Sequence, residues 1–141
     1  MGRGYWLPPG ADKLAACDGF YIQGDAVYKS DFSKDWDTFL QNLCNGLCFK
    51  DRSFLKICAW ETCGFAENRF VVLKNKYIDI VADDSDGDIA VYALIPENCR
   101  MKKTALKVFP EYLSVLKTVL TELYPNKVYR RKNARVTEPV D

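Results

Sequence analysis

Six cysteines are the residues of this chain whose types and spacing are most able to do chemistry. Four of them lie between Cys44 and Cys63 in the pattern C-x3-C-x9-C-x4-C, and zinc sites usually use pairs with about two to four intervening residues. However, Cys44 continues the apolar face of an expected helix, and Cys58 lies inside a hydrophobic run. A thiol in such a place packs as a small apolar side chain. We therefore expect core packing and no bound metal, with a zinc site as the alternative.

Disulfide bonds and nucleophilic catalysis are the other chemistries open to these cysteines. The N-terminal residues lack the apolar run of a secretory signal, and disulfide-rich domains are usually small and secreted. Cys48 is the best-placed candidate for a reactive thiol, because Lys50 and Arg52 would favour its thiolate. The chain has no histidine, so the base that most often activates a cysteine is missing. We expect reduced cysteines in a cytoplasmic protein.

The absence of histidine also narrows the range of enzymes that this chain can be. It excludes serine–histidine and cysteine–histidine sites built within the chain, and zinc sites with two histidines. We find no glycine-rich phosphate-binding loop and no G-x-S-x-G motif. The sequence therefore favours a protein that is not an enzyme and that uses no cofactor.

A short acidic segment is a second place where chemistry is conceivable. Four aspartates fall within residues 83–88, and carboxylate oxygens are the ligands that Ca²⁺ and Mg²⁺ prefer. Asp86-Gly87 stands between two apolar runs, however, which is typical of a hairpin turn. We expect a solvated hairpin tip, with a divalent-ion site that includes Asp79 as the alternative.

The charge distribution points to the C-terminal third of the chain. Residues 1–99 contain 10 basic and 15 acidic residues, whereas residues 100–135 contain 10 basic and 2 acidic ones. A cluster near the C-terminus combines positive charge for phosphates with an aromatic ring that can stack on a base: Tyr129, Arg130, Arg131, Lys132 and Arg135. The alternative is a solvated face on which the long basic side chains cover apolar surface.

The N-terminal segment GYWLPPG is a candidate docking arm. Tyr5 and Trp6 precede a pair of prolines, and large aromatic side chains dominate the energetics of protein interfaces. The alternative is that this segment folds back and covers one side of the core.

The first expected helix would position Cys44 and Cys48. Apolar residues recur at helical spacing over residues 36–47. Asp31 or Ser33 can cap the N-terminus, and Gly46 is the expected end of the helix.

The second expected helix covers residues 110–123 and separates the two basic parts of the C-terminal third. Pro110 suits the first helical position, and Pro125 would end the helix. Short apolar or alternating runs predict strands between and around the helices, at residues 19–24, 54–60, 69–74, 77–82 and 88–95, with an edge strand at 127–132.

This order predicts an α+β fold: a mostly antiparallel sheet of about five strands with two amphipathic helices packed on one face. We expect a single domain over residues 1–141, with 1–18 as an irregular N-terminal arm and 132–141 as a loose C-terminal tail. No stretch approaches the ~20 apolar residues of a membrane helix, so we expect no membrane association. The favoured function is association with a protein partner or with a second copy of the chain. The alternative is nucleic-acid binding through residues 100–135.

Overall fold

The computed structural model of the protein describes residues 13–50, 61–65, 70–75, 77–85, 87–131 and 137–139. Strands and helices follow one another along the chain in the order β1 (Leu14–Ile22), α1 (Gly24–Val27), α2 (Phe32–Lys50), β2 (Glu61–Phe65), β3 (Phe70–Lys74), β4 (Asp79–Ser85), β5 (Asp88–Pro96), α3 (Lys102–Leu123), β6 (Val128–Arg131) and β7 (Thr137–Pro139). In these parts of the chain, no helix is both long and apolar enough to span a membrane.

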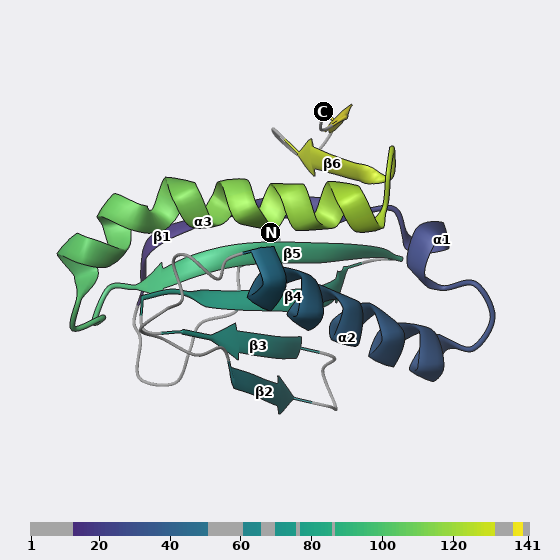
Figure 1. The fold of residues 1–141 in the computed structure, drawn as a ribbon, viewed down its shortest axis with the longest axis horizontal. Coiled ribbons are helices and arrows are strands. Elements are labelled where there is room, and N and C mark those ends of the chain that lie inside the picture. The colour runs from purple at the N-terminus through teal and green to yellow at the C-terminus, as the bar shows by residue number, and fades with distance from the viewer. Residues whose placement is uncertain are drawn as a thin grey trace.

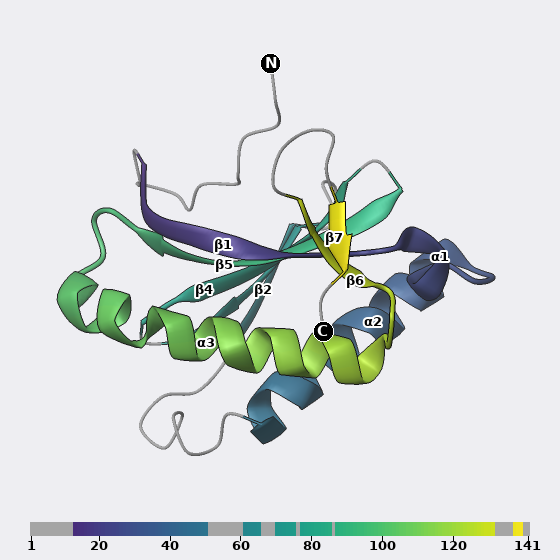
Figure 2. The same ribbon diagram turned by 90° about the horizontal axis from the view of Figure 1, so that it is seen from above.

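The strands form one antiparallel sheet in the order β2-β3-β4-β5-β1-β6-β7. The four strands from β2 to β5 follow the chain as a meander, and β1 pairs with β5 on the other side (Figure 1). Helices α2 and α3 lie on the same face of the sheet (Figure 2). The predicted α+β fold is therefore confirmed, and the sheet is wider than the expected five strands because short strands extend it at its edges.

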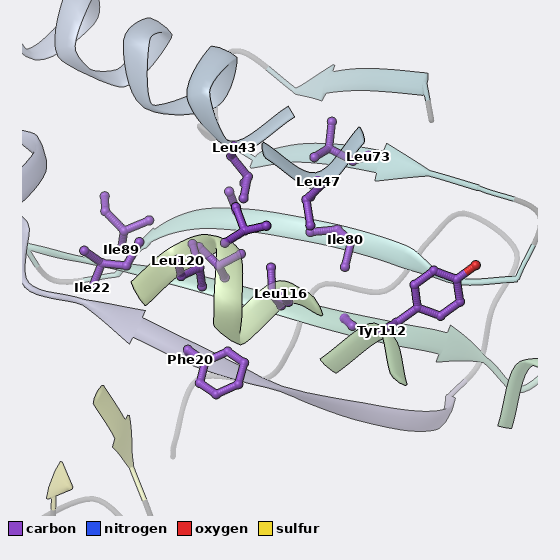
Figure 3. Close-up of a cluster of buried hydrophobic side chains, with 14 of the residues drawn as sticks. Phe20, Ile22, Leu43, Leu47, Leu73, Ile80, Ile89, Tyr112, Leu116 and Leu120 are labelled. Atoms are coloured by element: carbon purple, nitrogen blue, oxygen red, sulfur yellow. The ribbon is translucent and has the colours of Figure 1, made fainter. Parts of the chain in front are cut away.

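The two faces of the sheet follow from the alternation of side chains along each strand. In β5, the odd-numbered residues 89–95 belong to the core beneath the helices, whereas Ala90, Tyr92 and Leu94 belong to a smaller apolar cluster on the other face. Figure 3 shows the main core, in which side chains from both helices meet side chains from the sheet. It includes Phe20, Leu43, Leu47, Ile80, Leu116 and Leu120, all of which are buried.

Helix α2 begins where the sequence predicts and ends later. A carboxylate oxygen of Asp31 accepts hydrogen bonds from the N–H groups of Ser33 (3.2 Å) and Lys34 (3.4 Å), which makes Asp31 the N-cap. The expected end at Gly46 is wrong, because the helix continues to Lys50. Gly46 lies where α2 meets α3, and a helix tolerates glycine there because the packing of the two helices offsets its low propensity.

Helix α3 is longer than the pattern predicts. It begins at Lys102, so Pro110 lies inside the helix and not at its first position. A proline in a helix interior costs about 3 kcal/mol because it removes one hydrogen bond and crowds the preceding turn. Ala105 and Phe109 continue the buried face ahead of Pro110, and burial of this extra face favours the longer helix. The predicted end is confirmed, since the helix stops at Leu123, shortly before Pro125.

Hairpins join β3 to β4 and β4 to β5, and the second confirms the hairpin predicted from Asp86-Gly87. The side-chain oxygen of Asn75 accepts hydrogen bonds from the N–H groups of Tyr77 (2.8 Å) and Ile78 (2.9 Å) in the turn between β3 and β4. Gly87 has a φ of 89° in the turn between β4 and β5, a conformation that glycine adopts without strain.

The ends of the chain differ from the expected arm and tail. Strand β1 begins at Leu14 and not near Gly19, so the last residues of the expected 1–18 arm belong to the sheet. Thr137–Pro139 form β7 within the expected 132–141 tail. The predicted strand at 54–60 lies outside the described residues, and β2 follows it at Glu61.

Candidate functional site

A groove lies between α2 and α3, and most of its exposed surface is apolar. Its volume is about 610 Å³. Helix α2 contributes Asn42, Asn45, Gly46 and Phe49, and α3 contributes Val119, Glu122 and Leu123. The groove therefore opens on the side of the helices that faces away from the sheet.

At the floor of the groove, Gly46 of α2 packs closely against Val119 of α3. A β-carbon built on Gly46 would lie 2.7 Å from Cγ1 of Val119, which is shorter than a normal contact between carbon atoms. Val119 is buried on α3. The absence of a side chain thus lets the two helices approach closely at this point.

The wall of the groove carries the most exposed large apolar side chain of the described residues. Phe49 is 70% exposed in the last turn of α2. The C-terminal end of α2 projects beyond α3 on the side away from the sheet (Figure 2). Single exposed apolar residues are common, but this one borders an apolar hollow.

The surface around the groove is uncharged along α2. Residues 38–49 contain no Asp, Glu, Lys or Arg, although Thr38, Gln41, Asn42 and Asn45 are exposed. Glu122 is the one charged residue among those that line the groove. The cores of protein interfaces are depleted of charged residues and enriched in aromatic ones, and this surface has both features.

The predicted nucleic-acid residues are arranged differently from what the sequence suggests. Tyr129 is 9% exposed, its ring stacks on that of Tyr21 with the centroids 5.5 Å apart, and its hydroxyl donates a hydrogen bond to Asp88. Since neighbouring residues of a strand point to opposite faces, Arg130 lies on the other side of the sheet. There it pairs with Asp18 and its guanidinium lies 5.0 Å from the ring centroid of Phe20.

The other predicted binding residues are not described at the level of side chains. The backbone of Arg131 pairs with Thr137 in the sheet. Lys132 and Arg135 lie outside the described residues, as do Tyr5 and Trp6. Their roles in binding stay predictions.

The basic C-terminal third is divided into two parts by α3. Arg100, Lys102 and Lys103 lie at the start of this helix, and Arg130 lies in the strand that follows its end (Figure 1). A helix of 22 residues is about 33 Å long. The structure therefore places Arg130 far from the basic residues at the start of α3.

The acidic segment is only partly a solvated hairpin tip. Asp83 is 5% exposed, and Asp88 accepts hydrogen bonds from the Gly24 N–H (2.9 Å) and from Tyr129. Burial raises the pKa of Asp79 above its ordinary value, although the nearby charge of Lys74 acts in the opposite direction. The described side chains include no cluster of three or more potential metal ligands.

The cysteines do not share one environment. Cys44 packs against the main core and Cys17 against the smaller cluster on the other face of the sheet, as the packing interpretation predicts. Burial, and the charge of Asp18 to a smaller extent, raises the pKa of the Cys17 thiol to about 12. Cys48 is exposed beside Phe49, so the expectation of core packing is wrong for this residue. Cys58 lies outside the described residues, and the surroundings of the Cys63 side chain are not described either.

Comparisons with protein-family models, with curated proteins and with solved structures find no match to this chain. Function must therefore be inferred from the groove itself. Sequence reasoning missed Gly46 and Phe49 as site residues, and the signal that could have identified them is the uncharged stretch 38–49 in an amphipathic helix.

Proposed function

We propose that this protein is a non-enzymatic binding module that associates with protein through the groove between α2 and α3. One observation carries the proposal: Phe49 is largely exposed at the wall of an apolar groove on an uncharged helix surface. Complete burial of a phenylalanine side chain contributes roughly 1.5–3 kcal/mol. Docking of a protein surface would bury this ring and the hollow beside it together.

The sequence favours association with a protein, and the proposal assigns this association to the groove. A docking arm formed by Tyr5 and Trp6 stays a separate prediction, because these residues lie outside the described part of the chain. The cytoplasmic location belongs to the proposal as well. It is supported by the four cysteines whose side chains the structure describes, Cys17, Cys44, Cys48 and Cys99, none of which forms a disulfide.

Site-specific photo-crosslinking tests the proposal even while the partner is unidentified. A photoreactive amino acid at Asn45, within the groove, should give a discrete protein adduct in the producing cell. The same amino acid at Lys107, which is exposed on α3 outside the groove, is the matched control and should give none. Addition of Phe49→Asp should abolish the Asn45 adduct. Lack of an adduct from Asn45, or an adduct that persists with Phe49→Asp, would overturn the proposal.

A second candidate function is nucleic-acid binding at the start of α3. Arg100 and Lys103 are exposed there, and the first turn has neither an acidic residue nor a side-chain cap. Lys102 pairs with Glu97 at 2.5 Å. Phosphate groups would meet both positive side chains and the N–H groups at the helix N-terminus.

Fluorescence anisotropy with labelled DNA and RNA at several salt concentrations tests this second function. If it is correct, Arg100→Ala with Lys103→Ala lowers affinity and reduces the salt slope by roughly 0.9 for each lost contact to duplex DNA. Removal of two other positive charges from α3, by Lys107→Ala with Lys117→Ala, is the matched control. Equal effects of the two double variants, or no binding at low salt, would reject it.

A further inference from the structure

The back face of the sheet, which is the face opposite α2 and α3, is buried although both of these helices lie on the other side (Figure 2). We propose that residues 1–12 cover the back face of their own chain, with Tyr5 and Trp6 packed against the middle of the sheet. The sequence leaves two roles open for this segment, a docking arm for another protein and a cover for the core, and the burial of the back face favours the cover. The inference is independent of the groove between α2 and α3.

The back face carries an apolar cluster of its own. Its buried members are Val81, Ala90, Tyr92 and Leu94, and the residues packed against them are Leu14, Cys17 and Tyr21. All of these residues belong to β1, β4 and β5, whereas every helical residue of the described core belongs to the main cluster. The described elements thus give this cluster neighbours within the sheet but no helix above it.

The back face is nonetheless closed to solvent. Val81 and Leu94 are 0% exposed, and Tyr92 is 4% exposed. On an uncovered face of an antiparallel sheet, the outer ends of the side chains meet water, because neighbouring strands shield only their flanks. These exposed fractions refer to one chain by itself, so the cover belongs to the chain and not to a partner. Burial also raises the pKa of Cys17 and that of Asp79, and both side chains point to this face.

Strand β1 brings the preceding residues to the back face. Its pairing with β5 is irregular, because Leu14 pairs with Pro96 whereas Ala16 pairs with Ile95. Ala15 and Ala16 are consecutive, yet both pack against the main core, and Leu14 packs against the back-face cluster. Such a bulge bends a strand and changes the direction of its side chains. The chain that precedes Leu14 therefore starts beside the back-face cluster.

Residues 1–12 are long enough and apolar enough to cover this cluster. Twelve extended residues span up to about 40 Å, whereas β1 and β4 are separated by two strand spacings, or about 10 Å. The segment contains Tyr5, Trp6 and Leu7 followed by two prolines, and each aromatic side chain can bury about 150–250 Å². Because proline has no N–H group, it can lie on a sheet face without leaving a backbone donor unpaired.

The other stretches outside the described residues suit this position less well. Residues 66–69 connect β2 to β3 at the end of the sheet opposite to Leu94. Residues 132–136 connect β6 to β7, and five residues that leave and return reach only about 9 Å, which is less than the ~14 Å from β6 to β4. Residues 51–60 leave α2 on the other face and lead to the edge strand β2, three strands from β5. They are the competing cover.

Photo-crosslinking of the purified full chain locates the segment. A photoreactive phenylalanine derivative in place of Trp6 should crosslink within one chain, and trypsin should then release residues 4–13 joined to residues 77–100, which contain β4 and β5. The same amino acid in place of Lys107, which is exposed on α3, is the matched control and should give no link to residues 77–100. Links from position 6 to α2 or α3, links to a second chain, or no link at all would overturn the inference.

Thiol labelling tests the cover by its effect on Cys17. Tyr5→Ala with Trp6→Ala should raise the rate of iodoacetamide labelling of Cys17 by roughly tenfold or more, because the reagent then reaches the back face. Cys44 packs against the main core on the other face and is the internal control, so its rate should stay close to that of the wild type. An unchanged Cys17 rate, or an equal rise at Cys44, would overturn the inference, since an equal rise reports a general loss of stability.

Phe54→Ala with Trp60→Ala is the matched variant for the competing cover, because it removes the same kind of aromatic surface from residues 51–60. It should not raise the Cys17 rate relative to the Cys44 rate. A selective rise at Cys17 in this variant, without one in Tyr5→Ala with Trp6→Ala, would assign the cover to residues 51–60 and overturn the inference.

Discussion

Gly46 of α2 and Val119 of α3 are so close that a β-carbon on Gly46 would lie 2.7 Å from a methyl carbon of Val119. Both residues also line the groove that Phe49 borders. Gly46 therefore allows the two helices to pack closely and also forms part of the groove surface. Its substitution should affect both stability and association.

Gly46→Ala should lower the free energy of unfolding by about 1 kcal/mol. Overpacking against Val119 costs about 1–3 kcal/mol, and the gain of about 1 kcal/mol in helix propensity offsets part of it. In a Val119→Ala background the same substitution should be neutral or stabilising, because the crowded methyl group is gone. Urea unfolding of the four proteins gives the coupling. Equal effects in both backgrounds would show that crowding by Val119 is not the reason why Gly46→Ala destabilises the protein.

Tyr129→Phe should destabilise the protein by about 1–3 kcal/mol, because the Asp88 carboxylate loses a buried hydrogen-bond donor. The ring stack on Tyr21 is retained, so the loss reports on the hydroxyl group alone. Tyr77→Phe is a suitable control, since Tyr77 is half-buried and only its backbone N–H takes part in the turn at Asn75. Thermal or urea unfolding that does not distinguish the two variants would contradict the role of Tyr129.

Cys48 should react with iodoacetamide at pH 8 far faster than Cys17. Burial raises the pKa of Cys17 to about 12, so its thiolate is roughly a thousandfold scarcer than that of an ordinary cysteine. Cys48 is also the more exposed of the two. Peptide mass spectrometry over a time course measures each rate separately. Similar rates for Cys17 and Cys48 would contradict this difference.

Asp79→Asn should stabilise the protein at neutral pH. Burial raises the pKa of Asp79 in the folded state, so the charged form is disfavoured by folding. The contribution of the protonated group to stability is complete below the unfolded-state pKa and is lost as the pH rises through the folded-state pKa. The benefit of Asn should therefore shrink as the pH falls through the folded-state pKa and be gone below the unfolded-state pKa of about 4. Urea unfolding between pH 3.5 and 8 checks this, and a benefit that is independent of pH would contradict it.

The sequence by itself determined those elements, such as α2 and the β4–β5 hairpin, that depend only on residues close together in the chain. The apolar spacing from Trp36 to Leu47 predicted α2, because one face of a helix repeats at that period. Asp86-Gly87 predicted the β4–β5 hairpin, because glycine accepts the positive φ that the turn requires. The α+β fold followed from the order of these elements, since each has one apolar face that must be covered.

Tertiary structure decided what depends on residues distant in the sequence. Gly46 was expected to end α2, and only the proximity of Val119 explains why it lies inside the helix. Pro110 was expected to begin α3, and only the burial of the preceding turns against the sheet explains the longer helix. Tyr129 and Arg130 are adjacent in the sequence and appear as one cluster.

The separation of Tyr129 from Arg130 shows why the candidate site could not be read from the sequence alone. Alternation along β6 sends the ring to Tyr21 and Asp88 on one face, and the guanidinium to Asp18 on the other. The groove is likewise a product of two helices that lie far apart in the chain, and only their packing places Phe49 beside Leu123. The sequence determined which surfaces are apolar or uncharged, and the packing of the helices decided that two of these surfaces form one groove, because a groove requires walls from both.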